Sequence, residues 1–261
     1  MEQIRIVQDF LFHIPIFPFL WVPHCLMMSL VVRQVYGPGA VQYAKSNPLS
    51  CFVRTMIYTY PGGILSSLLM AEPAFGFLAS TPTFLTMVTS WYLIFFSPRD
   101  FFAQFLIKSK LTFPCSMAQD FMRLQLCLNG VSSVAKTHPK ALFYMTFMGM
   151  CKSSGFMVFK YVEHLLDHGL DKSKPFRVPN YPTKTCLIAS LAFAIQACGL
   201  YDFGGNSAIL AGLTLLAVTL RLFFYISTDP YEWFENWTCF ILYGGNSVSL
   251  TAQEKASKKV I

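Results

Sequence analysis

Seven runs of mostly apolar residues, separated by short polar segments, organise this sequence. They cover residues 17–32, 49–70, 83–96, 117–135, 141–166, 183–200 and 207–226. A membrane-spanning helix needs about 20 mostly apolar residues, so each run is a candidate span, although the third is short. Residues 10–19 contain Pro15 and Pro18 and predict an irregular or interfacial entry instead. The pattern predicts an all-α polytopic membrane protein.

A single transmembrane domain is therefore expected over residues 1–261. Within it we expect helices 1–3 over about 17–97, helices 4–6 over about 115–200, helix 7 over about 207–227, and a tail over 228–261.

The second apolar run is interrupted near its middle by Pro61, Gly62 and Gly63. A helix that breaks at membrane depth frees backbone N–H and C=O groups, which other helices or water must then satisfy. The fifth run has a similar weak point at residues 153–155. Broken helices in matching positions of two inverted repeats are typical of solute-conducting folds. The pattern predicts a solute path at these breaks, although the two halves have only weak sequence similarity.

Composition and charge agree with a membrane chain. Only 13% of the residues are charged, against about a quarter in soluble domains, and 54% are hydrophobic. The net charge of +7 comes from cations between the apolar runs, which indicates membrane topology and no nucleic-acid partner. Lys and Arg gather after the first, third and fifth runs and in the tail. This bias predicts a lumenal N-terminus and a cytosolic C-terminus, so the sequon at Asn236 is expected to be unmodified.

Several short motifs resemble the trimeric intracellular cation (TRIC) channel family, and they occur in the family's order over most of the chain. They are Arg33, Pro38-Gly39-Ala40, Asn47-Pro48-Leu49-Ser50, Gly62-Gly63-Ile64-Leu65-Ser66, Ala71-Glu72-Pro73, Trp91-Tyr92, Phe95-Phe96-Ser97-Pro98, Asp100, Tyr181-Pro182-Thr183-Lys184 and Pro230-Tyr231-Glu232. The chain resembles a divergent paralogue of the B type.

The resemblance implies seven transmembrane helices, arranged as two inverted three-helix repeats plus a seventh helix. It also implies a homotrimer with a separate pore in each subunit, lined by the second and fifth helices. The pore and hinge residues would then be Pro61, Gly62, Gly63, Ser66, Lys152, Ser153, Ser154 and Gly155. The implied function is passive flow of monovalent cations, chiefly potassium, across the endoplasmic or sarcoplasmic reticulum membrane during calcium release.

One departure from the family lies in the fourth helix. There the family carries a Lys-Glu-Val signature and a further basic residue, which hold a phosphoinositide headgroup. Here residues 120–126 read Asp-Phe-Met-Arg-Leu-Gln-Leu, so only Arg123 could take part, and it could instead pair with Asp120 on the same helix face. A phosphatidylinositol bisphosphate lipid is therefore only a candidate ligand, and no other cofactor is expected.

Lys152 allows two interpretations. A cation inside a span faces protein or water by default, so Lys152 could border the pore and tune its conductance. It could equally be a snorkelling or ion-paired lysine. Because a fixed cation opposes cation flow, selectivity would have to come from carbonyls at the breaks and from hydroxyls such as those of Ser66, Ser153 and Ser154.

Other candidate chemistry is weak. Glu163, His164, Asp167 and His168 are interpreted as a solvated helix end, so no metal site and no enzymatic activity are expected. Lys258 and Lys259 near the C-terminus resemble a dilysine signal for retrieval to the endoplasmic reticulum. A secondary transporter is the alternative function and would need a carboxylate inside a span. A non-conducting regulatory paralogue is a further alternative.

Overall fold

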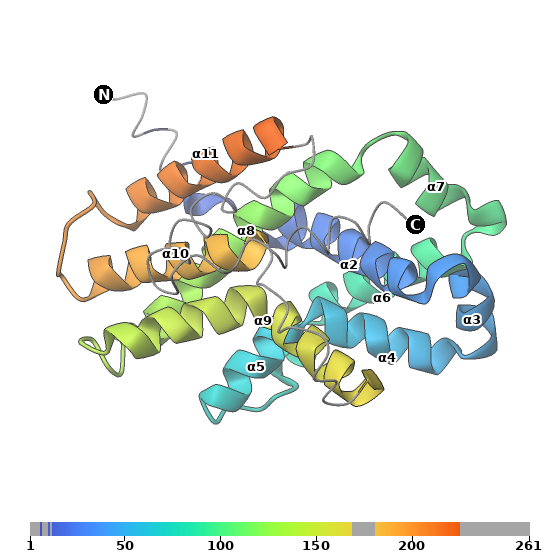
Figure 1. The fold of residues 1–261 in the computed structure, drawn as a ribbon, viewed down its shortest axis with the longest axis horizontal. Coiled ribbons are helices and arrows are strands. Elements are labelled where there is room, and N and C mark those ends of the chain that lie inside the picture. Colours follow the sequence, from blue (N-terminus) through green and yellow to red (C-terminus); the bar gives the residue numbers. More distant parts are fainter. Residues whose placement is uncertain (1–5, 7–9, 11, 169–180, 225–261) are drawn as a thin grey trace, which may run out of the picture. The chain divides into compact units, whose positions relative to one another are not determined.

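A computed structural model describes residues 6, 10, 12–168 and 181–224, and over these ranges every regular element is helical (Figure 1). The chain divides into two units, Met1–Val218 and Thr219–Ile261, and the description below concerns the first. The longer helices are α2 (Trp21–Tyr36), α4 (Pro48–Thr59), α5 (Pro61–Leu69), α6 (Thr81–Phe96), α8 (Thr112–Ala135), α9 (Leu142–His168), α10 (Tyr181–Ala197) and α11 (Asn206–Phe224).

Each of the seven apolar runs is helical in the structure. The second run forms two helices, α4 and α5, and the other runs correspond to α2, α6, α8, α9, α10 and α11. Among the described residues, one continuous helical stretch, Ile16–Ser46, is by itself long and apolar enough to cross a membrane, while α6 and residues Asn206–Arg221 form shorter apolar helices. The count of seven spans, the inverted repeat and the single-domain organisation stay predictions.

The first helix has the irregular entry that its prolines predict. The short segment η1 (Ile16–Leu20) is kinked at Phe17, whose φ and ψ are −98° and 135°, and the Phe17–Pro18 peptide bond is cis. Regular α-helix follows from Trp21.

Two short helices in the connections were not predicted from the apolar pattern. They are α3 (Ala40–Ser46) and α7 (Phe101–Lys108), and the 3-10 turns η2 (Gly37–Gly39), η3 (Gly76–Ala79) and η4 (Pro98–Asp100) occupy other connections. In α7, Ala103 and Leu106 are buried, whereas Phe101 and Phe105 are exposed. Seven or eight residues are too few to give a clear apolar period, and this is why the sequence pattern missed both helices.

The helices α8, α9 and α10 pack against one another through small residues. A Cβ atom placed on Gly130 of α8 would lie 2.8 Å from the Cα of Gly149 in α9, and one placed on Gly149 would lie 2.6 Å from the Oγ of Ser190 in α10. Helices in membranes approach this closely where the side chains at the contact are small. The same helices contribute most of the larger apolar core, with Leu124, Met148 and Phe193 buried in it.

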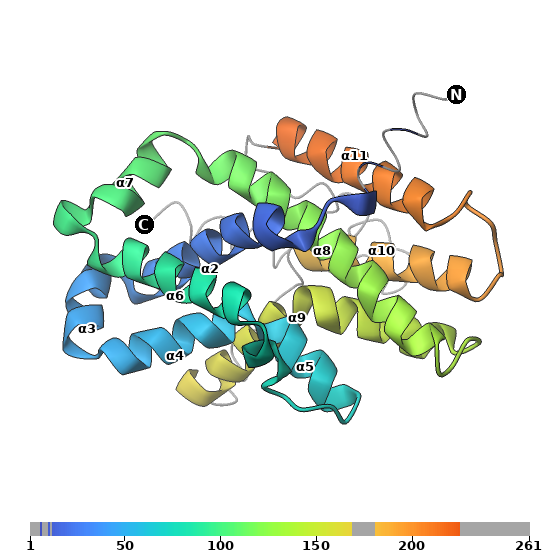
Figure 2. The same ribbon diagram turned by 180° about the vertical axis from the view of Figure 1, so that it is seen from behind.

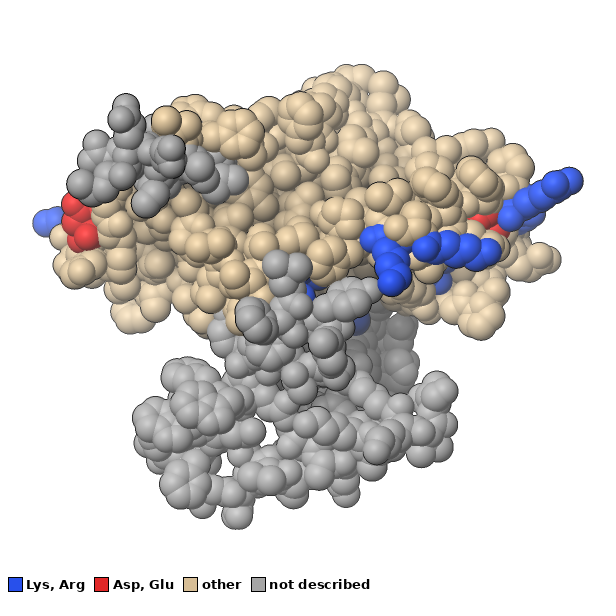
Figure 3. Space-filling model, turned by 90° about the horizontal axis from the view of Figure 1, so that it is seen from above, with Lys and Arg blue, Asp and Glu red and all other residues tan. Residues whose placement is uncertain are grey.

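A second apolar core lies between α2, α3, α4, α6 and α7, with Val32, Ile94 and Phe95 among its buried residues. On the face shown in Figure 3, charged side chains lie mostly toward its two ends, and a broad zone without charges separates them. Charged groups are costly within hydrocarbon, so this distribution agrees with a chain whose middle lies in a membrane.

Candidate functional site

The interruption predicted in the second apolar run is present and is centred on Tyr60. This residue has φ −110° and ψ 22°, and it separates α4 from α5. Pro61 has no N–H and occupies the first position of α5, where a missing donor is tolerated. Tyr60 donates its N–H to the carbonyl of Met56 and accepts the N–H of Ile64, each at 3.0 Å. The chain thus ends one helix and starts another within the apolar run.

The fifth apolar run has its own interruption, in α9. Ser154 has φ −118° and ψ 16°, outside the helical range, whereas α9 continues on both sides of it. The weak point predicted at residues 153–155 therefore exists, with the deviation at its middle residue.

The two interruptions lie against each other. A Cβ atom placed on Gly155 would lie 2.6 Å from both the Cα and the N of Gly62. A Cβ atom placed on Gly62 would lie 1.9 Å from the carbonyl oxygen of Lys152. The first turn of α5 and the middle of α9 are therefore in direct backbone contact, and the two helices lie side by side in both ribbon views (Figures 1 and 2).

The neighbouring glycines of α5 have different surroundings. Gly62 is buried in the contact with α9, whereas Gly63 is exposed and an added Cβ would meet nothing within 4 Å. Only Gly62 is thus required by close packing. For Gly63, the structure offers no steric reason for glycine.

Hydroxyl groups surround the contact, as the sequence suggested. The hydroxyl of Ser66 donates to the carbonyl of Gly63 at 3.1 Å, and that of Ser153 donates to the carbonyl of Gly149 at 2.8 Å. The Oγ of Ser154 is buried and has no hydrogen-bond partner in the described part of the chain. Each oxygen keeps a lone pair that could face a cation or water. Their role in a pore stays a prediction.

Lys152 lies one turn before Gly155 and is partly buried. Glu72, in the connection after α5, is an acidic neighbour of its ammonium group, and no ion pair between the two is present in the described structure. The structure thus places Lys152 beside the contact between the two breaks. Both interpretations of this side chain, as a neighbour of the pore or as a lysine balanced by an acid, stay open on this geometry.

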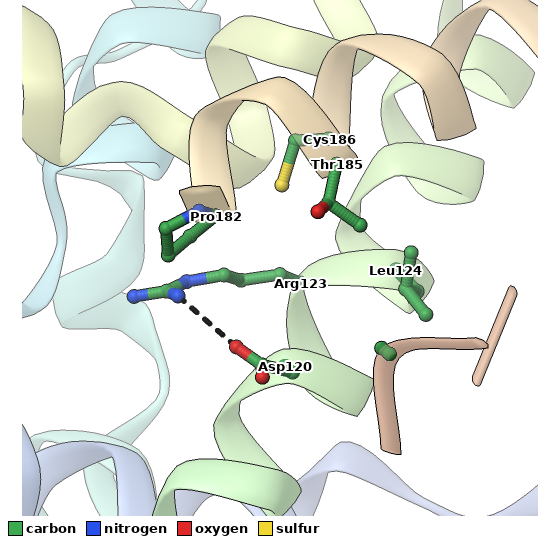
Figure 4. A pocket seen from close by; sticks show the side chains of 7 residues that line it. Asp120, Arg123, Leu124, Pro182, Thr185 and Cys186 are labelled. Carbon is green, nitrogen blue, oxygen red and sulfur yellow. Dashed lines mark hydrogen bonds and ion pairs between the residues drawn. The ribbon is translucent and has the colours of Figure 1, made fainter. Parts of the chain in front are cut away.

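Arg123 pairs with Asp120, the alternative that the sequence allowed. Its Nη1 lies 3.3 Å from Oδ1 of Asp120, one turn earlier in α8 (Figure 4). The pair borders a small pocket whose other lining residues are Leu124, Pro182, Thr185, Cys186 and Ala217. A phosphoinositide headgroup carries several negative charges and needs several cations. The structure shows Arg123 paired with a carboxylate, and binding of a phosphoinositide at this place stays a prediction.

A second ion pair was missed by sequence reasoning. Arg33, at the end of α2, pairs with Asp100 in the connection after α6, and both residues belong to motifs that carry the family resemblance. The Nη1 of Arg33 also donates to the carbonyl of Ile94 at 2.9 Å. Because 67 residues separate the partners, no local spacing could have revealed the pair.

His24 was also missed, although it lies within the first apolar run. Its Nε2 is 3.0 Å from the carbonyl oxygen of Thr59, the last residue of α4, and its Nδ1 is 3.2 Å from the amide nitrogen of Gln119 in α8. The useful signal was the presence of an ionisable residue inside a candidate span, which marks a functional position by default.

Several predicted residues lie outside the described structure. The proposed retrieval residues Lys258 and Lys259 and the sequon at Asn236 are among them, so these predictions are untested. The backbone of α9 extends to His168, but the side chains of Glu163, His164, Asp167 and His168 are not among those described.

Comparison with known proteins gives consistent matches. A family model for the TRIC channel matches residues 37–227. The trimeric intracellular cation channel type 1B.2 of Caenorhabditis elegans is 24% identical over 259 residues, which cover 94% of this chain and 80% of that protein. The type B channel of Danio rerio is 28% identical over 187 residues, covering 71% of this chain and 64% of that protein.

Solved structures show a similar fold. A C. elegans trimeric intracellular cation channel without Ca2+ has a TM-score of 0.77 and 22% identity, covering 85% of this chain and 95% of that chain. A structure described for TRIC counter-ion channels in calcium release has a TM-score of 0.74 and 24% identity, covering 83% of this chain and 96% of that chain.

Proposed function

Because this chain belongs to the TRIC channel family, we propose that it forms a cation channel whose pore passes the contact between α5 and α9. The permeant ion is a monovalent cation, chiefly potassium, and its flow balances charge during calcium release. Relatives with a similar sequence are named trimeric intracellular cation channels, of both the B and the A type.

The observation that carries the proposal is the backbone contact of the two helix breaks. Breaks at membrane depth are tolerated where other helices cover them or where they line a water-filled path. Gly62 and Gly155 bring the breaks of α5 and α9 to one place in the subunit. Carbonyl oxygens at the breaks and the hydroxyls of Ser66, Ser153 and Ser154 then lie near one path, and such oxygens can replace the water around a cation.

The proposed membrane architecture is seven spans, built as two inverted repeats of three helices followed by α11. The assembly is a homotrimer with one pore in each subunit, in keeping with the names of the relatives. Light scattering of the purified chain in detergent measures this assembly directly. A monomeric mass would contradict the trimer.

The proposed location is the membrane of the endoplasmic reticulum, with a lumenal N-terminus and a cytosolic C-terminus. The charge bias supports this orientation, and Lys258 and Lys259 supply a dilysine retrieval signal that acts only from the cytosolic side. Replacing both lysines with alanine should release the protein to later compartments. Unchanged retention would remove the signal from the proposal and leave the channel untouched.

Recording from the purified full chain in planar bilayers with asymmetric KCl tests the function. Ohmic unitary currents that reverse near the potassium equilibrium potential support the channel. Electrical silence with measurable cation flux in vesicles would instead indicate a secondary transporter, and the absence of both would indicate a regulatory paralogue. A transporter needs an intramembrane carboxylate to couple ions. The carboxylate of Asp120 is buried but paired with Arg123, and this pairing favours the channel.

A further inference from the structure

We propose that His24 is a positioning residue of the pore: it holds the carbonyl that the break leaves free at the end of α4, and so sets how α4 meets α5. The inference rests on the proposed function, because it treats this break as one wall of the pore. It concerns the first helix of the chain, which is not one of the two helices that carry the breaks.

The break leaves the carbonyl of Thr59 without its partner within the helix. In a continuous helix each carbonyl accepts the N–H four residues later, so Thr59 would be paired with Gly63. Here a new helix begins at Pro61, and the carbonyl of Thr59 accepts a hydrogen bond from His24 instead. An unpaired carbonyl away from water costs free energy comparable to a lost hydrogen bond. The side chain of His24 therefore replaces the backbone N–H that the carbonyl of Thr59 loses at the break.

The two partners of the imidazole determine which of its nitrogens carries the hydrogen. A carbonyl oxygen only accepts, so the Nε2 of His24 carries the hydrogen that is donated to Thr59. The amide nitrogen of Gln119 only donates, so the Nδ1 of His24 is the acceptor. The ring is thus a neutral imidazole with a single tautomer. Because both nitrogens are engaged, its orientation is determined by two other helices, α4 and α8.

Buried neighbours hold the imidazole of His24 in place. Gln119 is only 4% exposed, and the ring of Trp21, one turn before His24 on α2, lies 5.4 Å from the imidazole. Trp21 in turn donates its Nε1 to the carbonyl of Thr83 in α6 at 3.0 Å, and its ring lies 5.2 Å from that of Tyr60 at the break. One face of α2 thus contacts α4, α6 and Tyr60, the residue at the break.

The test separates the bond to Thr59 from general packing. In the variant His24→Gln, the amide at the end of the longer side chain can replace Nε2 and still donate to Thr59. In His24→Asn, the shorter side chain keeps a polar group near the position of Nδ1 but cannot reach Thr59. Gln125→Leu is the matched control, because it removes a side-chain hydrogen bond of the same 3.0 Å length to a distant backbone carbonyl, that of Ile14, away from the break.

Two measurements are made on the full chain. Hydrogen–deuterium exchange in detergent follows the amides of Tyr60 and residues 62–66, and planar-bilayer recording in KCl follows open probability and conductance. We expect His24→Asn to exchange about fivefold faster than wild type at these amides, the effect of losing one hydrogen bond, and to change open probability at least about twofold. His24→Gln and Gln125→Leu should stay near wild type in both measurements.

The outcomes distinguish this inference from the proposed function. Equal exchange and equal open probability in His24→Asn and His24→Gln would overturn the role of His24, while cation currents from the wild type would keep the channel. If His24→Asn exchanges faster but the wild type carries no current, the hydrogen bond to Thr59 is supported and its link to a pore is overturned. An equal effect of Gln125→Leu would show that the loss of any side-chain hydrogen bond has this result, and it would also overturn the inference.

Discussion

Arg33 and Asp100 form a two-pronged ion pair, in which the Nη1 and Nη2 atoms of the guanidinium each lie 2.5 Å from a different carboxylate oxygen. Paired hydrogen bonds of this kind between charged groups are stronger than neutral ones and more specific in geometry. The pair ties the end of α2 to the connection between α6 and α7. It therefore fixes the chain where α2 and α6 leave the second apolar core.

This ion pair predicts a pH-dependent loss of stability. The hydrogen bonds from Arg33 hold the pKa of Asp100 below its ordinary value of 3.8. A carboxylate with a lowered pKa stabilises the folded state above that ordinary value and loses this contribution as the pH falls through the lowered pKa. Asp100→Asn should thus lower the free energy of unfolding by about 2 kcal/mol at pH 7. Thermal denaturation in detergent should show the difference from wild type shrinking below pH of about 4.

The control for this prediction is Arg33→Lys. Lysine keeps the positive charge but cannot bind both carboxylate oxygens in parallel. The midpoint of its thermal denaturation is therefore expected between those of wild type and Asp100→Asn. A constant difference between wild type and Asp100→Asn from pH 7 to pH 3 would show that the effect does not come from ionisation of Asp100.

The two adjacent glycines at the break should differ sharply in their tolerance of alanine. Gly62→Ala places a methyl group 1.9 Å from the carbonyl oxygen of Lys152, so the helices must separate. We expect a loss of about 3 kcal/mol in the free energy of unfolding and loss of normal currents. Gly63→Ala meets open space and removes a glycine from a helix, so we expect unchanged or slightly increased stability. Thermal denaturation and bilayer recording of both variants provide the comparison.

Lys152→Ala tests whether that side chain borders the ion path. Removing a fixed positive charge near a cation pathway should raise unitary conductance, by about twofold at low salt, and the difference should shrink in 1 M KCl because salt screens the charge. Lys152→Arg keeps the charge and should stay near wild type. Equal conductance of the wild type and Lys152→Ala at low salt would place this lysine away from the pore.

The pairing of Arg123 predicts a gain rather than a loss of lipid binding in one variant. Asp120→Asn removes the negative partner of Arg123 and frees its guanidinium. Binding of fluorescent phosphatidylinositol bisphosphate to the detergent-solubilised chain should be weak in wild type and about fivefold tighter in Asp120→Asn. Adding Arg123→Ala to that variant should abolish the gain. Tight binding by the wild type would indicate a lipid site built from other residues.

The helices and their breaks could be predicted because their causes are local. Apolar runs of sufficient length mark the helices, and Pro61 and Gly62 interrupt one of these runs through their own backbone chemistry. The deviation at Ser154 also follows from its local sequence, in which two serines precede Gly155. In each case the residues that cause the feature are neighbours along the chain.

The contacts between distant segments could not be predicted in this way. The backbone contact between Gly62 and Gly155, the bond of His24 to Thr59 and the pairing of Arg33 with Asp100 all depend on how the helices pack. No period along the sequence encodes which helix faces which. Only the small size of glycine and the presence of ionisable residues within or beside apolar runs marked these positions in advance.

The glycine contact also lies at a mechanically special place. Gly155 is thirteen residues from each end of α9, which runs from Leu142 to His168. At 1.5 Å per residue, each half of the helix is about 20 Å long. The kink at Ser154 lies next to this contact, so the two halves can turn about it separately. A rotation of either half by about 5° would move its outer end by about 2 Å, and the equal lengths give both ends the same reach.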